Sequence, residues 1–149
     1  MTKDIKIDTV LEEWKVDAVI DETKLSHEII KVPSLHAKYL DYFLYFKRKL
    51  SKAESVRAKM GWQKRKYFRG EFAQDDLTKH GWSQWNGLKP SSTELNQLLE
   101  FDTDMVDYQQ AITEYKTCVS GCEYIMNSLK SREFALKSLI DYQKFILGN

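Results

Sequence analysis

A basic stretch that also contains aromatic residues is the part of this sequence best suited to chemistry. Residues 47–69 hold ten Lys or Arg side chains against the single acid Glu54, a net charge of +9. The whole chain carries only +1, so the residues outside the stretch sum to −8. Positive charge concentrated in this way favours contact with a polyanion. Trp62, Tyr67 and Phe68 lie among the cations, and such rings stack on unpaired bases. The stretch therefore predicts a nucleic-acid-binding surface that prefers single strands.

The contacts that this pattern predicts come mostly from the second half of the stretch. Candidate phosphate contacts are Lys64, Arg65, Lys66 and Arg69, followed by Lys59 and Arg57, and candidate stacking groups are Trp62 and Tyr67. The alternative interpretation is an ordinary solvated helix face that is rich in Lys and Arg.

Other kinds of chemistry have little support in the sequence. There is no GxxxxGK[ST], GxGxxG or HExxH motif, and the three histidines are scattered. Cys118 and Cys122 are four residues apart, but no third thiol or histidine lies nearby to complete a metal site. We interpret them as packing residues, and we expect no catalytic residues, no metal and no cofactor.

The composition favours long helices. Only eight of the 149 residues are Gly or Pro, and 30% are charged. We expect an all-α protein with a single domain, residues 1–149, in which long kinked helices pack as a helical hairpin or bundle. Its predicted parts are an N-terminal arm (1–20), a kinked basic helix (21–69), a loop (70–91) and a long C-terminal helical region (92–149). No apolar run reaches the length of a membrane span, which predicts an intracellular protein with no membrane partner.

Local signals predict the ends of these helices. Thr9 and Asp21 are candidate N-caps, and Ser91 with Glu94 forms a capping box. Pro33 predicts a kink or short break. Gly61 predicts an end or a loosening of the basic helix, which would leave residues 62–69 as a frayed tip that orders on its ligand.

Two apolar stripes predict how the helices pack. One runs along residues 35–60, and we expect the C-terminal helix to pack against it. In the C-terminal region, ten successive a/d-type positions are apolar. After Glu133 a second apolar surface starts in a new phase, which we assign to contacts with sister subunits. The ten positions are Leu98, Phe101, Met105, Tyr108, Ile112, Tyr115, Val119, Cys122, Met126 and Leu129, and the second surface consists of Phe134, Leu136, Leu139, Ile140, Phe145 and Ile146.

Two further features leave alternatives open. Trp82 and Trp85 in the loop either pin it onto the helices or contact nucleic acid or a partner. Between Glu94 and Glu114 there are six acids and no Lys or Arg. These acids either shield the basic stretch, face a basic partner or reflect the acidity common at helix N-termini.

Three segments in the same order resemble one protein family. Residues 19–25 (VIDETKL), 64–70 (KRKYFRG) and 129–137 (LKSREFALK) are similar to the UvsY recombination mediators of tailed phages, and the last segment is the most specific. Trp62 stands where this family can have a basic residue. The resemblance spans most of the chain.

The resemblance implies a function and a set of partners. The expected function is a recombination mediator that binds single-stranded DNA, displaces the single-strand binding protein and loads a RecA-like recombinase. The resemblance also implies a ring-like homo-oligomer, a heptamer, assembled through the C-terminal region, and we expect the protein to act in the cytoplasm of the host cell. The alternative function is a coiled-coil structural or adaptor protein whose basic helix binds an acidic protein.

Overall fold

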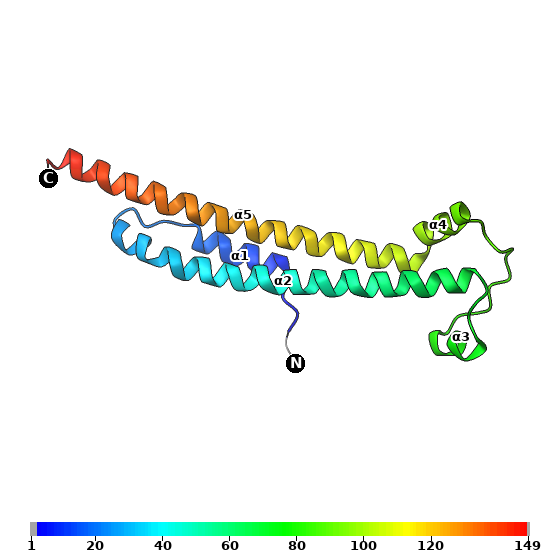
Figure 1. Cartoon of the computed structure of the whole chain (residues 1–149). Helices are drawn as coiled ribbons and strands as arrows, with labels where there is room; N and C mark the ends of the chain where they lie inside the picture. Colours follow the sequence, from blue (N-terminus) through cyan, green and yellow to red (C-terminus); the bar gives the residue numbers. More distant parts are fainter. Residues whose placement is uncertain (1–2, 149) are drawn as a thin grey trace. The chain divides into compact units, whose positions relative to one another are not determined.

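The computed structural model describes residues 3–148, and all the regular secondary structure in that range is helical (Figure 1). This confirms the predicted all-α class. The helices are α1 (Ile7–Asp17), α2 (Leu25–Phe68), α3 (Gln74–His80), α4 (Ser92–Phe101) and α5 (Thr103–Ile146).

The chain forms two compact units. Unit 1 consists of Met1–Arg48 and Tyr115–Asn149, and unit 2 consists of Lys49–Glu114. The long helices α2 and α5 each contribute to both units. That residues 1–149 act as a single domain stays a prediction.

In unit 1 the first half of α2 packs against α5. Leu25 and Val32 of α2 form a buried cluster with Leu136 of α5, and Tyr39 and Phe46 continue the buried side of α2. Residues of the α5 stripe that are buried in this unit include Val119, Cys122 and Leu129. The predicted packing of the two long helices on each other is therefore present within unit 1.

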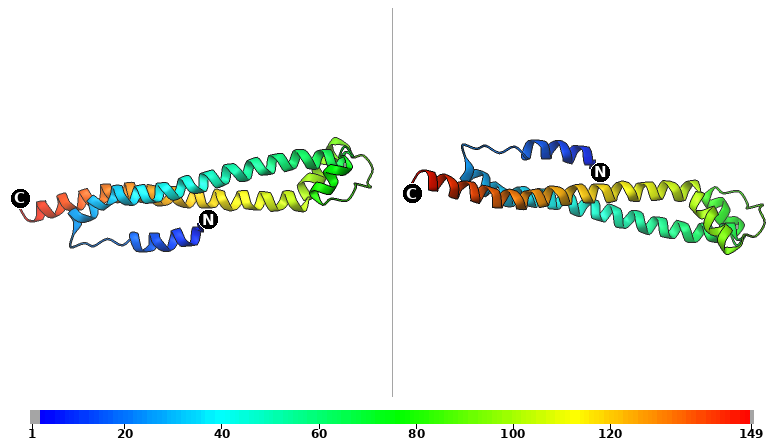
Figure 2. Two further views of the ribbon diagram at one scale, coloured as in Figure 1. Left: turned by 90° about the horizontal axis from the view of Figure 1, so that it is seen from below. Right: turned by 90° about the horizontal axis from the view of Figure 1, so that it is seen from above.

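Helix α1 lies to one side of this pair (Figure 2), and its residue Val10 is buried. Arg132 of α5 donates hydrogen bonds to the carbonyl oxygens of Asp17 (2.9 Å) and Ala18 (2.7 Å) at the end of α1. These carbonyls have no partner within their own helix, so the guanidinium acts as a C-terminal cap. The Arg132 guanidinium also lies over the Trp14 ring, which meets Tyr39 edge-on at 5.5 Å.

The two cysteines pack within unit 1. Neither forms a disulfide within the described residues, both are buried, and burial raises the pKa of Cys122 to about 11. A thiol with so high a pKa is protonated near neutral pH and is a poor nucleophile or metal ligand.

Unit 2 is built around the end of α2. Phe68 of α2 clusters with Leu95 and Leu99 of α4, and Met105 and Ile112 of α5 are also buried. The Ser91–Glu94 capping box is present at the start of α4, which confirms that prediction.

The predicted continuous helix over 92–149 is interrupted at Asp102. Asp102 has extended backbone angles, and its carboxylate accepts a hydrogen bond from the Met105 amide (3.2 Å), so it caps α5. The interruption changes the helical phase, which explains why Phe101, a predicted stripe position, is 79% exposed. Helix α3 lies inside residues 70–91, where we predicted only a loop.

Three helix boundaries in unit 1 differ from the predictions. Helix α1 begins at Ile7, not after Thr9. Asp21 does not cap α2, because its carboxylate instead accepts hydrogen bonds from the amide and hydroxyl of Thr23 in a turn before the helix. The break at Pro33 is absent, since α2 continues through it. Buried residues on both sides of Pro33, Leu25 and Tyr39 among them, hold the helix together against the cost of proline.

The predicted end of the helix at Gly61 is also wrong. Helix α2 remains regular to Phe68, so residues 62–69 are not a frayed tip. The physical reason lies in the packing, because a Cβ atom at Gly61 would lie 3.3 Å from Met105 Cε. The missing side chain permits a close approach of α5, and that contact offsets the low helix propensity of glycine.

Candidate nucleic-acid interface

Helix geometry gives the unit 2 part of α2 two opposite sides. At about 100° per residue, Lys52, Lys59, Trp62 and Lys66 fall on one side, whereas the buried Lys64 and Phe68 fall on the other. Lys52 and Lys59 are exposed, and so is Arg69 at the end of the helix. We call Lys52, Lys59, Trp62, Lys66 and Arg69 the basic face.

Trp62 is the large aromatic residue on this face. Trp62 is 59% exposed, so much of its ring surface is open to a ligand. The Lys66 ammonium lies 4.0 Å from the centre of the Trp62 ring, within the range of a cation–π contact. A base that stacks on Trp62 would therefore have a cation beside it, ready to meet its phosphate.

Lys64 has a different environment from its basic neighbours. It is 7% exposed, and its ammonium is 2.9 Å from Asp104, 3.2 Å from Asp102 and 4.3 Å from the centre of the Trp82 ring. Burial alone would lower the pKa of Lys64, but the hydrogen bonds and charges of the two carboxylates outweigh it and raise the pKa above its ordinary value. The Lys64 side chain thus holds α2, the start of α5 and the loop together, and its ammonium is not presented to solvent.

Tyr67, a predicted stacking group, also faces inward. Its hydroxyl donates a hydrogen bond to the Ser83 carbonyl, and its ring is 5.2 Å from Trp82. Trp85 meets Phe68 edge-on at 5.0 Å. Both loop tryptophans therefore pin residues 70–91 onto α2, in agreement with the packing interpretation.

Arg57 and Arg65 lie off the basic face, with Arg57 on the same side of α2 as Lys64, and both line a groove together with Trp62. The groove also includes Asn96 and Glu100 of α4, and its volume is about 420 Å³. Arg65 is exposed, with Nη2 3.5 Å from Asn96 Oδ1, while Arg57 is half-buried. The structure thus brings Arg57, Trp62 and Arg65 together and separates Lys64 and Tyr67 from them.

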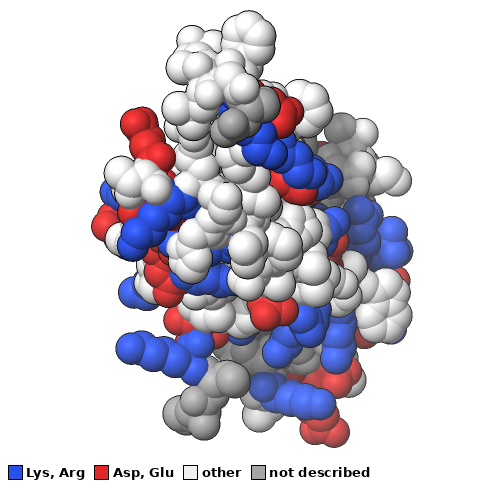
Figure 3. Space-filling model, turned by 90° about the vertical axis from the view of Figure 1, so that its left-hand side faces the viewer, with Lys and Arg blue, Asp and Glu red and all other residues white. Residues whose placement is uncertain are grey.

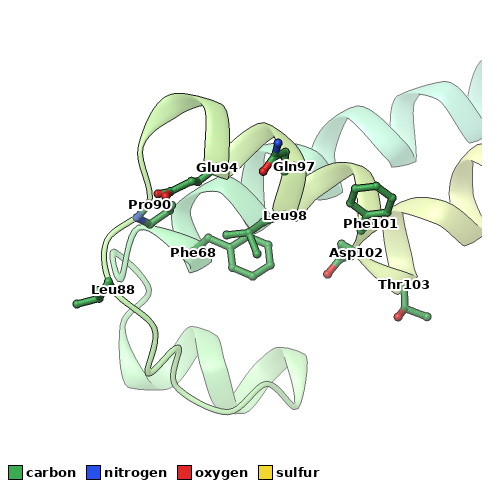
Figure 4. Close-up of a pocket in the computed structure, with 9 residues that line it drawn as sticks. All are labelled: Phe68, Leu88, Pro90, Glu94, Gln97, Leu98, Phe101, Asp102 and Thr103. Carbon is green, nitrogen blue, oxygen red and sulfur yellow. The ribbon is translucent and has the colours of Figure 1, made fainter.

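A second hollow in unit 2 differs in chemistry. It lies between the end of α2, α4 and the chain that leads into α4, and Figure 4 shows Phe68 and Leu98 on its wall with Phe101 and Leu88 further out. Its charged residues are Glu94 and Asp102, and none of the residues that line it is basic. Its electrostatics therefore disfavour a phosphate backbone, so we do not assign it to DNA.

The residues predicted for contacts between subunits divide into two groups. Leu136 is buried in unit 1, and Ile140 packs against the same cluster, so both support the fold of the protomer. The exposed members are Phe134 (77%), Phe145 (80%) and Ile146 (62%), and Leu139 is 39% exposed. In Figure 3 the end of α5 forms a largely uncharged projection at the top of the view.

The sequence analysis did not assign roles to several residues around the basic face. Asn96 and Glu100, which line the groove, belong to a helix that we treated as a packing element. Asp102 and Asp104, which bind Lys64, were noted only as two of the six acids between Glu94 and Glu114. The excess of acids opposite a basic stretch was the available signal, and two of these acids do bind Lys64.

Comparisons with known proteins agree with this architecture. The family model described as "Recombination, repair and ssDNA binding protein UvsY" matches residues 13–149. The chain belongs to the UvsY family. The curated relative "Recombination protein uvsY" of Enterobacteria phage T4 is 22% identical over 144 residues, which is 97% of this chain and 99% of the relative.

Crystal structures of the bacteriophage T4 recombination mediator protein UvsY have the same fold. One crystal form gives a TM-score of 0.80 at 23% identity over 97% of this chain and 99% of that chain. A second gives 0.77 at 22% identity over 95% and 98%. As a UvsY family member, this chain is a recombination and repair protein that binds single-stranded DNA.

The structure explains what the segment most similar to the UvsY family does in the fold. Within LKSREFALK, Arg132 caps α1 and Leu129 and Leu136 are buried, so the segment builds unit 1.

None of the helices in residues 3–148 has the uninterrupted apolar length that crossing a bilayer requires.

Proposed function

We propose that this UvsY family member is a non-enzymatic recombination mediator that holds single-stranded DNA on its basic face. On the held strand it promotes loading of a RecA-like recombinase while the single-strand binding protein is displaced. The T4 relative that carries the name recombination mediator protein supports this role. We place the protein in the cytoplasm of the infected host cell, where phage recombination takes place.

One observation supports the DNA site most directly. Within unit 2, α2 buries Lys64 and Phe68 on one side and exposes Lys52, Lys59 and Trp62 on the other. An exposed indole among exposed lysines matches an unpaired strand, which supplies bases for the ring and phosphates for the cations. Of the predicted contacts, we retain Arg57, Lys59, Trp62, Arg65, Lys66 and Arg69, and we assign Lys64 and Tyr67 to holding the site in shape.

Replacing Lys59 and Lys66 together by alanine tests this proposal. Each lost phosphate contact should reduce the slope of log affinity against log salt by about 0.7 for a single strand, so the double variant should lose about 1.4. Fluorescence anisotropy of a labelled oligothymidylate, measured from low to moderate salt, gives the slope directly.

The matched control removes the same charge elsewhere. Lys116 and Lys130 are exposed residues of α5 in unit 1, and their double alanine variant should change the slope much less. Equal losses in the two variants would show that only net charge matters and would refute the assignment to the basic face.

We also propose that the protein is a ring-like homo-oligomer, a heptamer as the family resemblance implies. The exposed apolar residues at the end of α5, Phe145, Ile146 and Leu147 among them, support a contact with sister subunits. A ring would repeat the basic face along one strand, so that several weak sites gain from effective concentration.

A further inference from the structure

The groove beside Trp62 has the properties of a site for a single base. It is lined by Arg57, Ala58, Gly61, Trp62 and Arg65 on one side and by residues of α4 on the other. Its volume of about 420 Å³ lies within the range of small-molecule sites. Leu99 and Met105, which also line it, are nearly buried and give the groove an apolar floor suited to the flat surface of a ring.

Arg57 provides the second observation. Its Nε atom is buried and has no hydrogen-bond partner among residues 3–148. A buried donor without a partner destabilises the fold, so such a group needs a ligand or another explanation. Because the Arg57 side chain lines the groove, an acceptor held there would lie close to this guanidinium.

Trp62 connects the groove to the basic face. It belongs to the same side of α2 as Lys59 and Lys66, and it also forms part of the groove wall. A strand whose phosphates follow the basic face could therefore turn one base around the indole edge and into the groove. A paired base cannot make this turn without leaving its partner, so the groove would select single strands.

The polar groups of the groove indicate which base fits. Arg57 and Arg65 offer donors, Glu100 offers a carboxylate acceptor, and Asn96 offers both. Guanine has the acceptors O6 and N7 that arginine commonly binds. Guanine also carries N–H donors on its Watson–Crick edge that suit a carboxylate. The pyrimidines have no N7, so they cannot offer arginine the same pair of acceptors.

We propose that this groove binds one unpaired purine of the DNA strand, with guanine preferred over thymine. The proposal rests on the proposed function, because it needs a strand held on the basic face. The groove makes the affinity depend on the base, whereas phosphate contacts by the lysines alone would give the same affinity for every sequence.

The test uses the full-length protein and three short oligothymidylates of equal length. Their central position carries guanine, thymine or an abasic site, and affinities are compared at one salt concentration because phosphate contacts depend on salt. The guanine strand should bind about tenfold more tightly than the abasic strand, in line with the contribution of one stacked base. Equal affinities for all three strands would overturn the proposal.

Two variants locate the effect. Arg57→Met removes the donor, and Ala58→Phe fills the groove without changing charge, so both should abolish the preference for guanine. Ala37→Phe is the matched control, since Ala37 is an exposed alanine of α2 in unit 1, and it should keep the preference. A preference that persists in Ala58→Phe, in a protein with unchanged circular dichroism, would also overturn the proposal.

The salt slope separates this proposal from the proposed function. If all strands bind with the expected slope but without base preference, only the groove assignment fails. If no strand binds in a salt-dependent manner, the DNA site on the basic face fails, and the groove assignment fails with it.

Discussion

Lys64 shows that a basic residue within the helix proposed to bind DNA can have a structural role. Its ammonium is held by Asp102 and Asp104, and Asp102 is itself largely buried. Removing the cation would leave a carboxylate partly desolvated and unpaired, which is costly. Lys59, on the same helix, is exposed, so its removal would leave no buried carboxylate without a partner.

Replacing Lys64 by methionine should therefore lower the stability of unit 2 and leave the electrostatics of DNA binding nearly unchanged. We expect a loss of about 2 kcal/mol in the free energy of unfolding, measured from the urea midpoint. The salt slope for oligothymidylate should stay close to that of the unaltered protein. Lys59→Met is the matched control and should give the opposite result, with an unchanged midpoint and a shallower slope. A normal midpoint with a shallower slope for Lys64→Met would contradict this role.

The sequence could identify the basic stretch but could not separate its members. Lys64, Arg65 and Lys66 are consecutive and chemically alike, and their roles depend on whether α4 and α5 cover them. The Ser91–Glu94 capping box was predictable because it is complete within four residues. The cap of α1 by Arg132 was not, since its partners lie 114 and 115 positions away in the sequence. The groove likewise depends on the approach of α4, which no local pattern specifies.

At the scale of elements, Asp17 ties α1 to α2. Its carboxylate accepts hydrogen bonds from the Lys38 ammonium and the Tyr39 hydroxyl, each at 2.7 Å. Burial alone would raise the pKa of Asp17, but these hydrogen bonds and the charges of Lys38 and Arg132 lower it below 3.8 overall. A group with a lowered pKa stabilises the folded state above its unfolded pKa, and the stabilisation is lost as the pH falls through the folded pKa.

Acidification should therefore loosen α1 before the rest of unit 1. We expect the hydrogen-exchange protection of residues 7–17 to fall as the pH drops below about 4, because Asp17 becomes protonated and releases Lys38. Asp17→Asn should reduce the protection already at neutral pH and weaken its dependence on pH. Asp21→Asn removes a carboxylate whose pKa is also lowered, but one that lies outside α1, so it should leave residues 7–17 protected. Equal effects of the two substitutions would contradict a specific role for Asp17.

At the scale of the whole molecule, the residues of α5 that fold the protomer precede those proposed for contacts between subunits. Leu136 and Arg132 maintain unit 1, so truncation of everything after Leu129 would damage the protomer as well as any contact between subunits. Phe145 and Ile146 lie beyond these residues and are 80% and 62% exposed. Their burial between protomers would remove apolar surface from water, at about 25 cal/mol per Å².

Phe145→Ser combined with Ile146→Ser should therefore reduce the assembly while the protomer stays folded. Light scattering should report a smaller particle at unchanged helicity, and the affinity for a long single strand should fall because fewer basic faces act together. Affinity for a strand short enough to contact one protomer should change little. Leu136→Ala is the contrasting variant, since loss of a buried leucine should cost about 2–5 kcal/mol of protomer stability. A full-size particle in the double serine variant would show that the assembly uses another surface.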